Sequence, residues 1–162
     1  MSHKDVAPTR DPFLHMPVPW VFVLAYFIGV GVQILVPVKA RSGLQIPAQI
    51  GGAVLFVLGA AIAGWSLGLF RRGGRTTTTP GDFSTRLVTN GPFRFTRNPM
   101  YLGLVLAYLG EEGLVAQIWP LPFLALTVVY VNWFVLPIEE ASLEEVFGER
   151  YRRYCAGVRR WI

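Results

Sequence analysis

The sequence has little that could support metal or disulfide chemistry. It contains one cysteine, Cys155, and two histidines, His3 and His15, among its 162 residues. A single cysteine cannot form an intrachain disulfide, and structural zinc sites are built from clusters of cysteine and histidine. Charged side chains are also scarce, at 15% of the residues. We therefore expect no metal site, and a buried or idle role for Cys155.

Apolar residues, in contrast, make up 52% of the chain, and aromatic residues 14%. They gather into blocks at 17–38, 46–70 and 119–138, with another from Pro99 past Gly110. These lengths approach the roughly 20 helical residues that cross a bilayer core. The pattern predicts an all-α fold: an integral membrane bundle of about four transmembrane helices.

Three of these blocks carry features that bear on packing. The second block is rich in small residues, which let membrane helices approach closely; they are Gly51, Gly52, Gly59, Ala60, Ala61, Ala63 and Gly64. The third block meets Glu111 and Glu112, which we expect to end a short helix at the headgroups, although they could instead line a polar cavity. Asn132, inside the fourth block, is expected to hydrogen bond to a neighbouring helix.

The polar segments complete the predicted organisation. Residues 1–16 are expected to form a flexible tail, residues 17–138 the transmembrane domain, and residues 71–98 a basic loop within it. The segment 139–162 has apolar residues at spacings of three and four opposite charged ones, which predicts one amphipathic interfacial helix. That helix is expected to complete a cofactor pocket.

The distribution of basic residues predicts the orientation in the membrane. Eleven of the fifteen Lys and Arg residues lie in the basic loop and the C-terminal tail. Short basic flanking segments tend to remain cytoplasmic, so both are expected there, with the N-terminus on the same side. The net charge of +5 is then explained by anionic lipid rather than by nucleic acid.

The segment 91–103 joins the basic loop to the third block and has two open interpretations. Asn98 suits a helix N-cap and Pro99 the first helical position, so the segment could simply start a helix. Arg94 and Arg97 would then only contact lipid phosphate. Alternatively, the helix start and these arginines form a site for a carboxylate or phosphate.

Glu139 and Glu140 follow Pro137 at the end of the fourth block. A carboxylate near hydrocarbon is costly without a partner, and Arg94 or Arg97 could supply one. Adjacent helical residues point about 100° apart, so we expect one glutamate to face a ligand and the other to be solvated or to cap a helix. A plain helix-terminus role, which complements the helix dipole, is equally open.

The C-terminal half resembles the isoprenylcysteine carboxyl methyltransferase and phospholipid methyltransferase superfamily. The resemblance rests on residues 91–103 and Glu139-Glu140, followed by Leu143, Phe147-Gly148, Tyr151, Tyr154 and residues 158–161. Members often have histidine at the position of Asn98, although asparagine is also common there. What the resemblance implies is transfer of a methyl group from S-adenosylmethionine to a lipid or lipid-linked acceptor, either a prenylcysteine carboxylate or a phospholipid amine.

The resemblance also implies roles for individual residues. The S-adenosylmethionine pocket would be built from Arg97, Asn98, Pro99, Met100, Tyr101, Glu139 and Glu140. Arg97 would hold the cofactor carboxylate, and Glu140 its ribose hydroxyls or amino group. Tyr101 would border the reacting centre, and Arg94 would act on the acceptor side as a second catalytic candidate.

Two other functions fit the same features. Some membrane reductases that reduce isoprenoid or sterol-like double bonds with a nicotinamide cofactor share similar C-terminal motifs, although they are usually larger. A non-catalytic membrane scaffold could keep the basic loop for lipid headgroups alone. Indifference to substitution of Arg97 or Glu140 would favour the scaffold.

Overall fold

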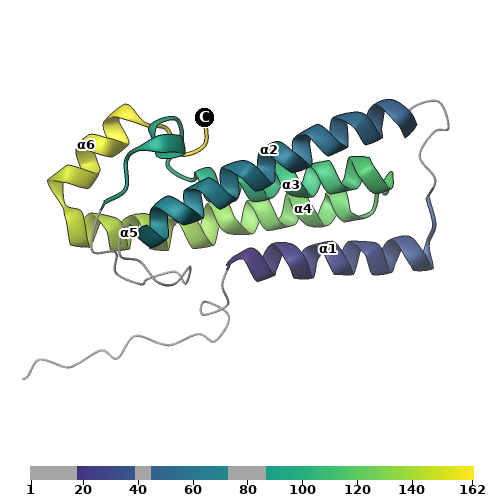
Figure 1. Ribbon diagram of the computed structural model, residues 1–162. Helices are drawn as coiled ribbons and strands as arrows, with labels where there is room; N and C mark the ends of the chain where they lie inside the picture. The colour runs from purple at the N-terminus through teal and green to yellow at the C-terminus, as the bar shows by residue number, and fades with distance from the viewer. Residues whose placement is uncertain (1–17, 39–44, 73–86) are drawn as a thin grey trace, which may run out of the picture.

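The computed structural model describes residues 18–38, 45–72 and 87–162, and within them the chain is helical, without strands (Figure 1). The elements are α1 (Val18–Leu35), α2 (Gln45–Arg72), η3 (Gly91–Arg94), α3 (Pro99–Val115), α4 (Pro120–Tyr130), η4 (Val131–Val135), α5 (Leu136–Phe147) and α6 (Glu149–Gly157). The predicted tail 1–16 and residues 73–86 of the basic loop lie outside the described residues. The all-α bundle predicted from the sequence is confirmed.

Three of the described helices are long and apolar enough to cross a membrane. They are α1, α2 and the continuous helix from Pro120 to Phe147, which comprises α4, η4 and α5. The fourth bundle helix, α3, has 17 residues and carries Glu111 and Glu112. It lies alongside α2 for most of its length (Figure 1). The chain is therefore a helical membrane bundle.

Glycines allow α2 and α3 to pack in close antiparallel contact. A Cβ atom added at Gly52 would lie 2.6 Å from the Gly110 carbonyl oxygen, and one at Gly103 would lie 2.6 Å from the backbone nitrogen of Ala63. Gly59 is equally crowded by the backbone of α3. The predicted packing role of small residues is thus confirmed on one face of α2.

The expectation that α3 ends at its glutamates is wrong. The helix continues past them to Val115 and ends at Ala116, which has a left-handed φ of 55°. The reason is tertiary packing: a Cβ atom on Gly113 would lie 2.8 Å from the Ala48 carbonyl oxygen, so this turn is held against α2. Glu112 is consequently buried, at 4% exposure.

The C-terminal region is not one separate helix beginning at residue 139. The fourth span continues through Glu139 and Glu140 to Phe147, and it contains a π-helical turn just before Pro137, where Leu136 N–H donates to the Val131 carbonyl. Proline cannot donate a backbone hydrogen bond and its ring crowds the preceding turn, which favours such a bulge. Gly148, with φ of 50°, then separates α5 from α6.

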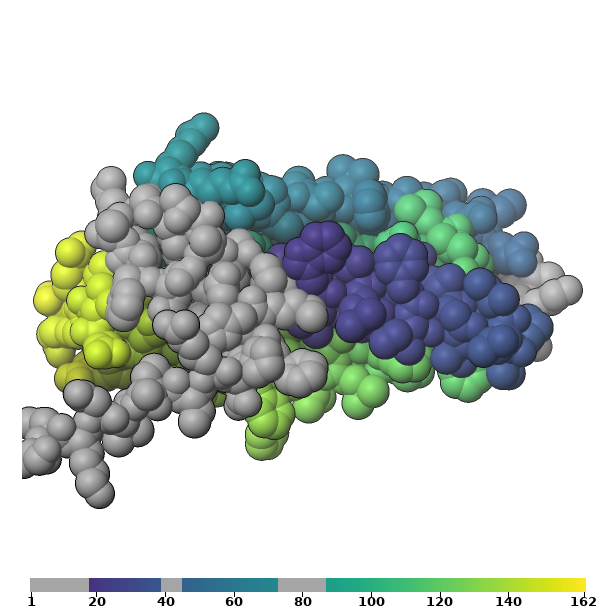
Figure 2. Space-filling model, turned by 90° about the horizontal axis from the view of Figure 1, so that it is seen from below, coloured from purple at the N-terminus to yellow at the C-terminus, as the bar shows by residue number. Residues whose placement is uncertain are grey.

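The first helix packs against α4, and the C-terminal segment returns to the bundle. Figure 2 shows α1 on one face of the molecule, flanked by α2. A Cβ atom on Gly29 would collide with Pro120, so α1 and α4 approach closely there. The Trp161 indole donates a 2.9 Å hydrogen bond to Asn132 Oδ1 in η4. Asn132 therefore binds the C-terminal segment rather than a neighbouring helix.

Candidate functional site

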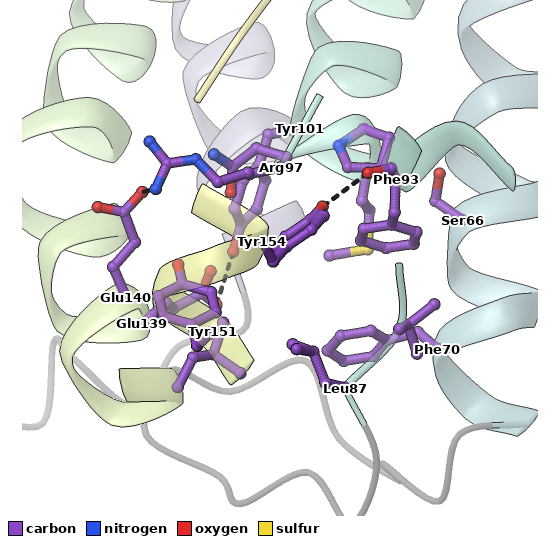
Figure 3. Close-up of a pocket in the computed structure, with 15 residues that line it drawn as sticks. Ser66, Phe70, Leu87, Phe93, Arg97, Tyr101, Glu139, Glu140, Tyr151 and Tyr154 are labelled. Atoms are coloured by element: carbon purple, nitrogen blue, oxygen red, sulfur yellow. Dashed lines mark hydrogen bonds and ion pairs between the residues drawn. The ribbon is translucent and has the colours of Figure 1, made fainter. Parts of the chain in front are cut away.

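A cavity lies where α3 begins, between the ends of α2 and α5 and beside α6 (Figure 3). It encloses about 780 Å³, including its open mouth. The lining residues come from four parts of the chain: Ser66 and Phe70; Leu87, Val88 and Phe93; Arg97, Asn98, Pro99, Met100 and Tyr101; and Glu139, Glu140, Leu143, Tyr151 and Tyr154. All seven predicted cofactor residues therefore line one cavity.

The start of α3 is held by the C-terminal segment. Asn98 occupies the N-cap position and Pro99 begins the helix, but the Asn98 side chain does not cap it. Instead Asn98 Nδ2 donates a 2.9 Å hydrogen bond to the Arg160 carbonyl, which also accepts from Thr96 Oγ1 at 3.1 Å. The Arg97 N–H donates to the Arg159 carbonyl at 3.0 Å. The chain's last residues thus position the segment that opens α3.

Glu140 is the centre of an ion-pair network at the cavity wall. Its Oε1 lies 3.0 Å from an Arg97 guanidinium nitrogen, and both carboxylate oxygens accept hydrogen bonds from Arg160. Burial tends to lower the pKa of Arg97, but the Glu140 carboxylate, Cys155 and Tyr151 together outweigh it, and the net pKa lies above its usual value. Arg97 is therefore a permanent cation at this site.

Glu139 faces the same cavity with a different partner. The Tyr101 hydroxyl donates a 2.9 Å hydrogen bond to Glu139 Oε1 (Figure 3). The expectation that only one of the two adjacent glutamates faces the site is wrong, since both line it. Their 100° separation instead directs them to different partners, Tyr101 for Glu139 and the two arginines for Glu140.

Two tyrosines of α6 close the cavity on another side. Tyr154 donates a 2.7 Å hydrogen bond to the Phe93 carbonyl, which ties α6 to the segment before α3. Burial raises the pKa of Tyr154 to about 12. Burial, and next a hydrogen bond with Cys155, raise the pKa of Tyr151, which is 4% exposed. Both phenols are therefore neutral at physiological pH.

The structure does not bring every predicted residue to the cavity. Arg94 is exposed in η3 and does not line it. Cys155 is not idle, because its sulfur accepts a 3.0 Å hydrogen bond from Arg97.

Some lining residues had no local sequence signal as site residues. Ser66 and Phe70 belong to the hydrophobic block that forms α2. Arg160, which binds Glu140 but does not line the cavity, was noted only as part of the resemblance. Tyr151 and Tyr154 carried a usable signal: their three-residue spacing, together with the motif, places them on one face of α6.

The cavity combines two kinds of surface. One side carries the carboxylates of Glu139 and Glu140 with the guanidinium of Arg97, and the other is apolar, with Phe70, Phe93 and the remaining aliphatic and aromatic residues. Such a mixture fits an amphiphilic organic ligand. Among the described residues, the buried Nε of Arg97 has no hydrogen-bond partner. A ligand carboxylate would satisfy this donor.

Residues 47–150 match the phospholipid methyltransferase family. The chain belongs to this family. The match includes α2, α3, α4 and α5, and thus most of the cavity's lining.

Individual relatives match shorter segments of the chain. A 77-residue segment is 36% identical to methanethiol S-methyltransferase 1 of Bradyrhizobium diazoefficiens, covering 47% of the present chain and 24% of that protein. A 74-residue segment is 32% identical to protein-S-isoprenylcysteine O-methyltransferase A of Arabidopsis thaliana, covering 44% and 36%. A 63-residue segment is 35% identical to an uncharacterized protein of Haemophilus influenzae, covering 39% and 79%.

The two named methyltransferases are thus matched over less than two fifths of their own lengths. No solved structure matches the chain.

Proposed function

We propose that this protein transfers a methyl group from S-adenosylmethionine to a lipid or lipid-linked acceptor at the cytoplasmic face of a membrane. The observation that carries the proposal is the meeting of residues 97–101 with Glu139 and Glu140 in one cavity that also has an apolar wall. Membership of the phospholipid methyltransferase family supports the reaction class. The methyltransferase names of two relatives support it as well.

The charged side of the cavity suits the polar parts of S-adenosylmethionine. The unpartnered Nε of Arg97 can bind the methionyl carboxylate, while Glu139 and Glu140 can accept hydrogen bonds from ribose hydroxyls or from the amino group. Asn98, Pro99 and Met100 form the adjoining wall at the start of α3. When bound, the cofactor would supply an electrophilic methyl group on a positively charged sulfur.

The protein's own part in such a reaction is positioning and the exclusion of water. Methyl transfer is an in-line displacement and requires no covalent enzyme intermediate. Tyr101 is 2% exposed and is fixed by Glu139, so it can orient a group at the reacting centre. Arg94 does not line the cavity, and we assign it only a headgroup contact on the acceptor side.

The proposed orientation places the basic loop, both termini and the cavity on the cytoplasmic side. There S-adenosylmethionine can enter from water, while an acceptor reaches the cavity from the bilayer. The division into a transmembrane domain at 17–138 and a C-terminal segment that completes the pocket is part of this proposal. It is supported by the contacts of Arg159 and Arg160 with residues 96–98.

Cofactor binding tests the proposal directly. Purified protein in detergent is titrated with S-adenosylmethionine and, separately, with a reduced nicotinamide cofactor by calorimetry. We expect S-adenosylmethionine to bind, and Arg97→Ala and Glu140→Gln each to weaken binding at least about tenfold, or roughly 1.4 kcal/mol. The matched control is Glu144→Gln on the same helix, because Glu144 pairs with Arg152 and does not line the cavity.

The other outcomes separate the competing functions. A folded sample that binds only the nicotinamide cofactor would favour the reductase. A folded sample that binds neither cofactor, with wild-type stability in both variants, would favour the scaffold. Thermal unfolding of each sample establishes that it is folded.

A further inference from the structure

A second hollow lies on the membrane side of the bundle, between α1 and α2 and over α3. It is an open groove whose empty space, with the solvent at its open side included, is about 610 Å³. Its walls are mostly apolar: Phe22, Val23 and Phe27 from α1, Phe56 from α2, and Leu104 and Ala107 from α3. Because α1 and α2 are long and apolar enough to span a membrane, hydrocarbon rather than water surrounds this groove.

The groove runs along the same helix that opens the cofactor cavity. Tyr101 lines the cavity, and Leu104, less than one turn further along α3, lines the groove. Tyr101, Leu104 and Tyr108 follow one another at spacings of three and four, so they lie on one stripe of α3. The near end of the groove therefore lies within about one turn of α3 from the proposed reaction centre.

Acidic and phenolic side chains occupy the far end of the groove. Glu111 and Tyr26 both line it. Glu112 is next in sequence and 4% exposed, and among the described residues neither of its carboxylate oxygens has a hydrogen-bond partner. A methylene chain extended past Glu111 would cover its carboxylate with hydrocarbon and offer it no hydrogen bond. The apolar path therefore ends at Glu111.

We propose that this groove holds one hydrocarbon chain of the methyl acceptor and that Glu111 limits its length. Ten residues separate Tyr101 from Glu111 on α3, a rise of about 15 Å. An extended dodecyl chain has a comparable length. This inference rests on the proposed function and narrows its substrate to amphiphiles whose chain does not exceed that length.

Photocrosslinking tests where the hydrocarbon chain of the acceptor lies. The probes are S-alkyl cysteines with octyl, dodecyl or hexadecyl chains that end in a diazirine, added to the protein in lipid nanodiscs. We expect the dodecyl probe to label the segments around Phe56 and Glu111 most strongly. Labelling confined to other lipid-facing residues, or equal yields for all three chains, would overturn the proposal.

A pair of neighbouring substitutions tests whether the groove itself is occupied. Val23 lines the groove at 41% exposure, whereas Leu24 is 53% exposed and does not line it. Neither residue belongs to the buried core, so tryptophan at either position leaves that core intact. Val23→Trp should lower dodecyl labelling about tenfold, equivalent to about 1.4 kcal/mol, and Leu24→Trp should not. Equal effects of both variants would contradict occupancy of the groove.

The length limit has its own test at Glu111. Glu111→Leu should raise labelling by the hexadecyl probe to the dodecyl level, whereas Glu111→Gln, which keeps a polar end, should not. An unchanged length profile in Glu111→Leu would overturn the limit.

Binding of S-adenosylmethionine is measured separately on the same nanodiscs. If S-adenosylmethionine does not bind, the proposed function fails, and the groove can no longer be assigned to a methyl acceptor. If S-adenosylmethionine binds but the label lies outside the groove, only the assignment of the groove to the acceptor chain is overturned.

Discussion

Arg97 and Glu140, 43 positions apart in the sequence, meet at 3.0 Å between the start of α3 and the middle of α5. Their side chains are 18% and 19% exposed, so the pair is largely withdrawn from solvent. Arg160, from the C-terminal segment, binds the same carboxylate. One glutamate therefore joins three separate parts of the chain beside the cavity.

The contribution of Arg160 to this network can be measured by removing its charge. Arg160→Met leaves Glu140 with Arg97 alone and should lower the free energy of unfolding by about 1.5–3 kcal/mol, the range for hydrogen bonds to charged groups. Thermal or denaturant unfolding in detergent measures it. Arg159→Met is the matched control, since the Arg159 side chain is exposed and only its carbonyl holds Arg97. Equal losses in both variants would contradict the network.

The close contact of α2 and α3 predicts a sharp difference between glycines of one helix. Gly59→Ala would press a methyl group into the backbone of Ala107 and should destabilise the protein by about 1–3 kcal/mol. Gly64→Ala should be neutral or slightly stabilising, because nothing lies within 4 Å of its added Cβ. Unfolding midpoints of the two variants test this, and a larger loss at Gly64 would be incompatible with the observed packing.

The hydrogen bond from Trp161 to Asn132 should anchor the C-terminal segment. Trp161→Phe removes the indole donor and should lower the free energy of unfolding by about 1 kcal/mol. Hydrogen exchange of the backbone amides at residues 158–162 should also become faster. Trp133→Phe is the control because Trp133, next to Asn132 in η4, is 71% exposed. No change in exchange after Trp161→Phe would mean that this bond does not hold the segment.

The pH dependence of stability should report on Tyr154. Burial raises its pKa in the folded protein to about 12, above the ordinary value of 10.0. The neutral phenol is thus favoured by folding, and its contribution is complete below pH 10 and is lost as pH rises toward 12. In Tyr154→Phe, stability should be lower at pH 8 but should fall less steeply between pH 10 and pH 11. An unchanged slope in thermal unfolding would argue against a buried phenol.

The sequence predicted those features that depend on composition and local spacing. Hydrophobic blocks predicted the helices, and the small residues of the second block predicted close packing at Gly52 and Gly59. The start of α3 at Pro99 also followed from local rules. Residues 97–101 and Glu139-Glu140 were expected to meet, and they do.

The features that local rules missed are decided by tertiary contacts. Packing of Gly113 against α2 carries α3 past Glu111 and Glu112, although two acidic residues would normally end such a helix. The Asn98 side chain does not cap α3. It donates instead to the Arg160 carbonyl, which lies 62 positions further along the chain. Arg160 itself binds Glu140 through a reversal of the chain at Gly148 that spacing alone does not reveal.

The transfer of a labelled methyl group tests the central claim most directly. Purified protein in nanodiscs, supplemented with a total lipid extract and with long-chain S-alkyl cysteines, is incubated with S-adenosylmethionine that carries a radiolabelled methyl group. We predict label in the organic phase with the wild-type protein and with Glu144→Gln, and at least about a tenfold lower rate, or 1.4 kcal/mol, with Glu140→Gln. Label that remains in the aqueous phase with a folded protein that binds S-adenosylmethionine would contradict methyl transfer to a lipid acceptor.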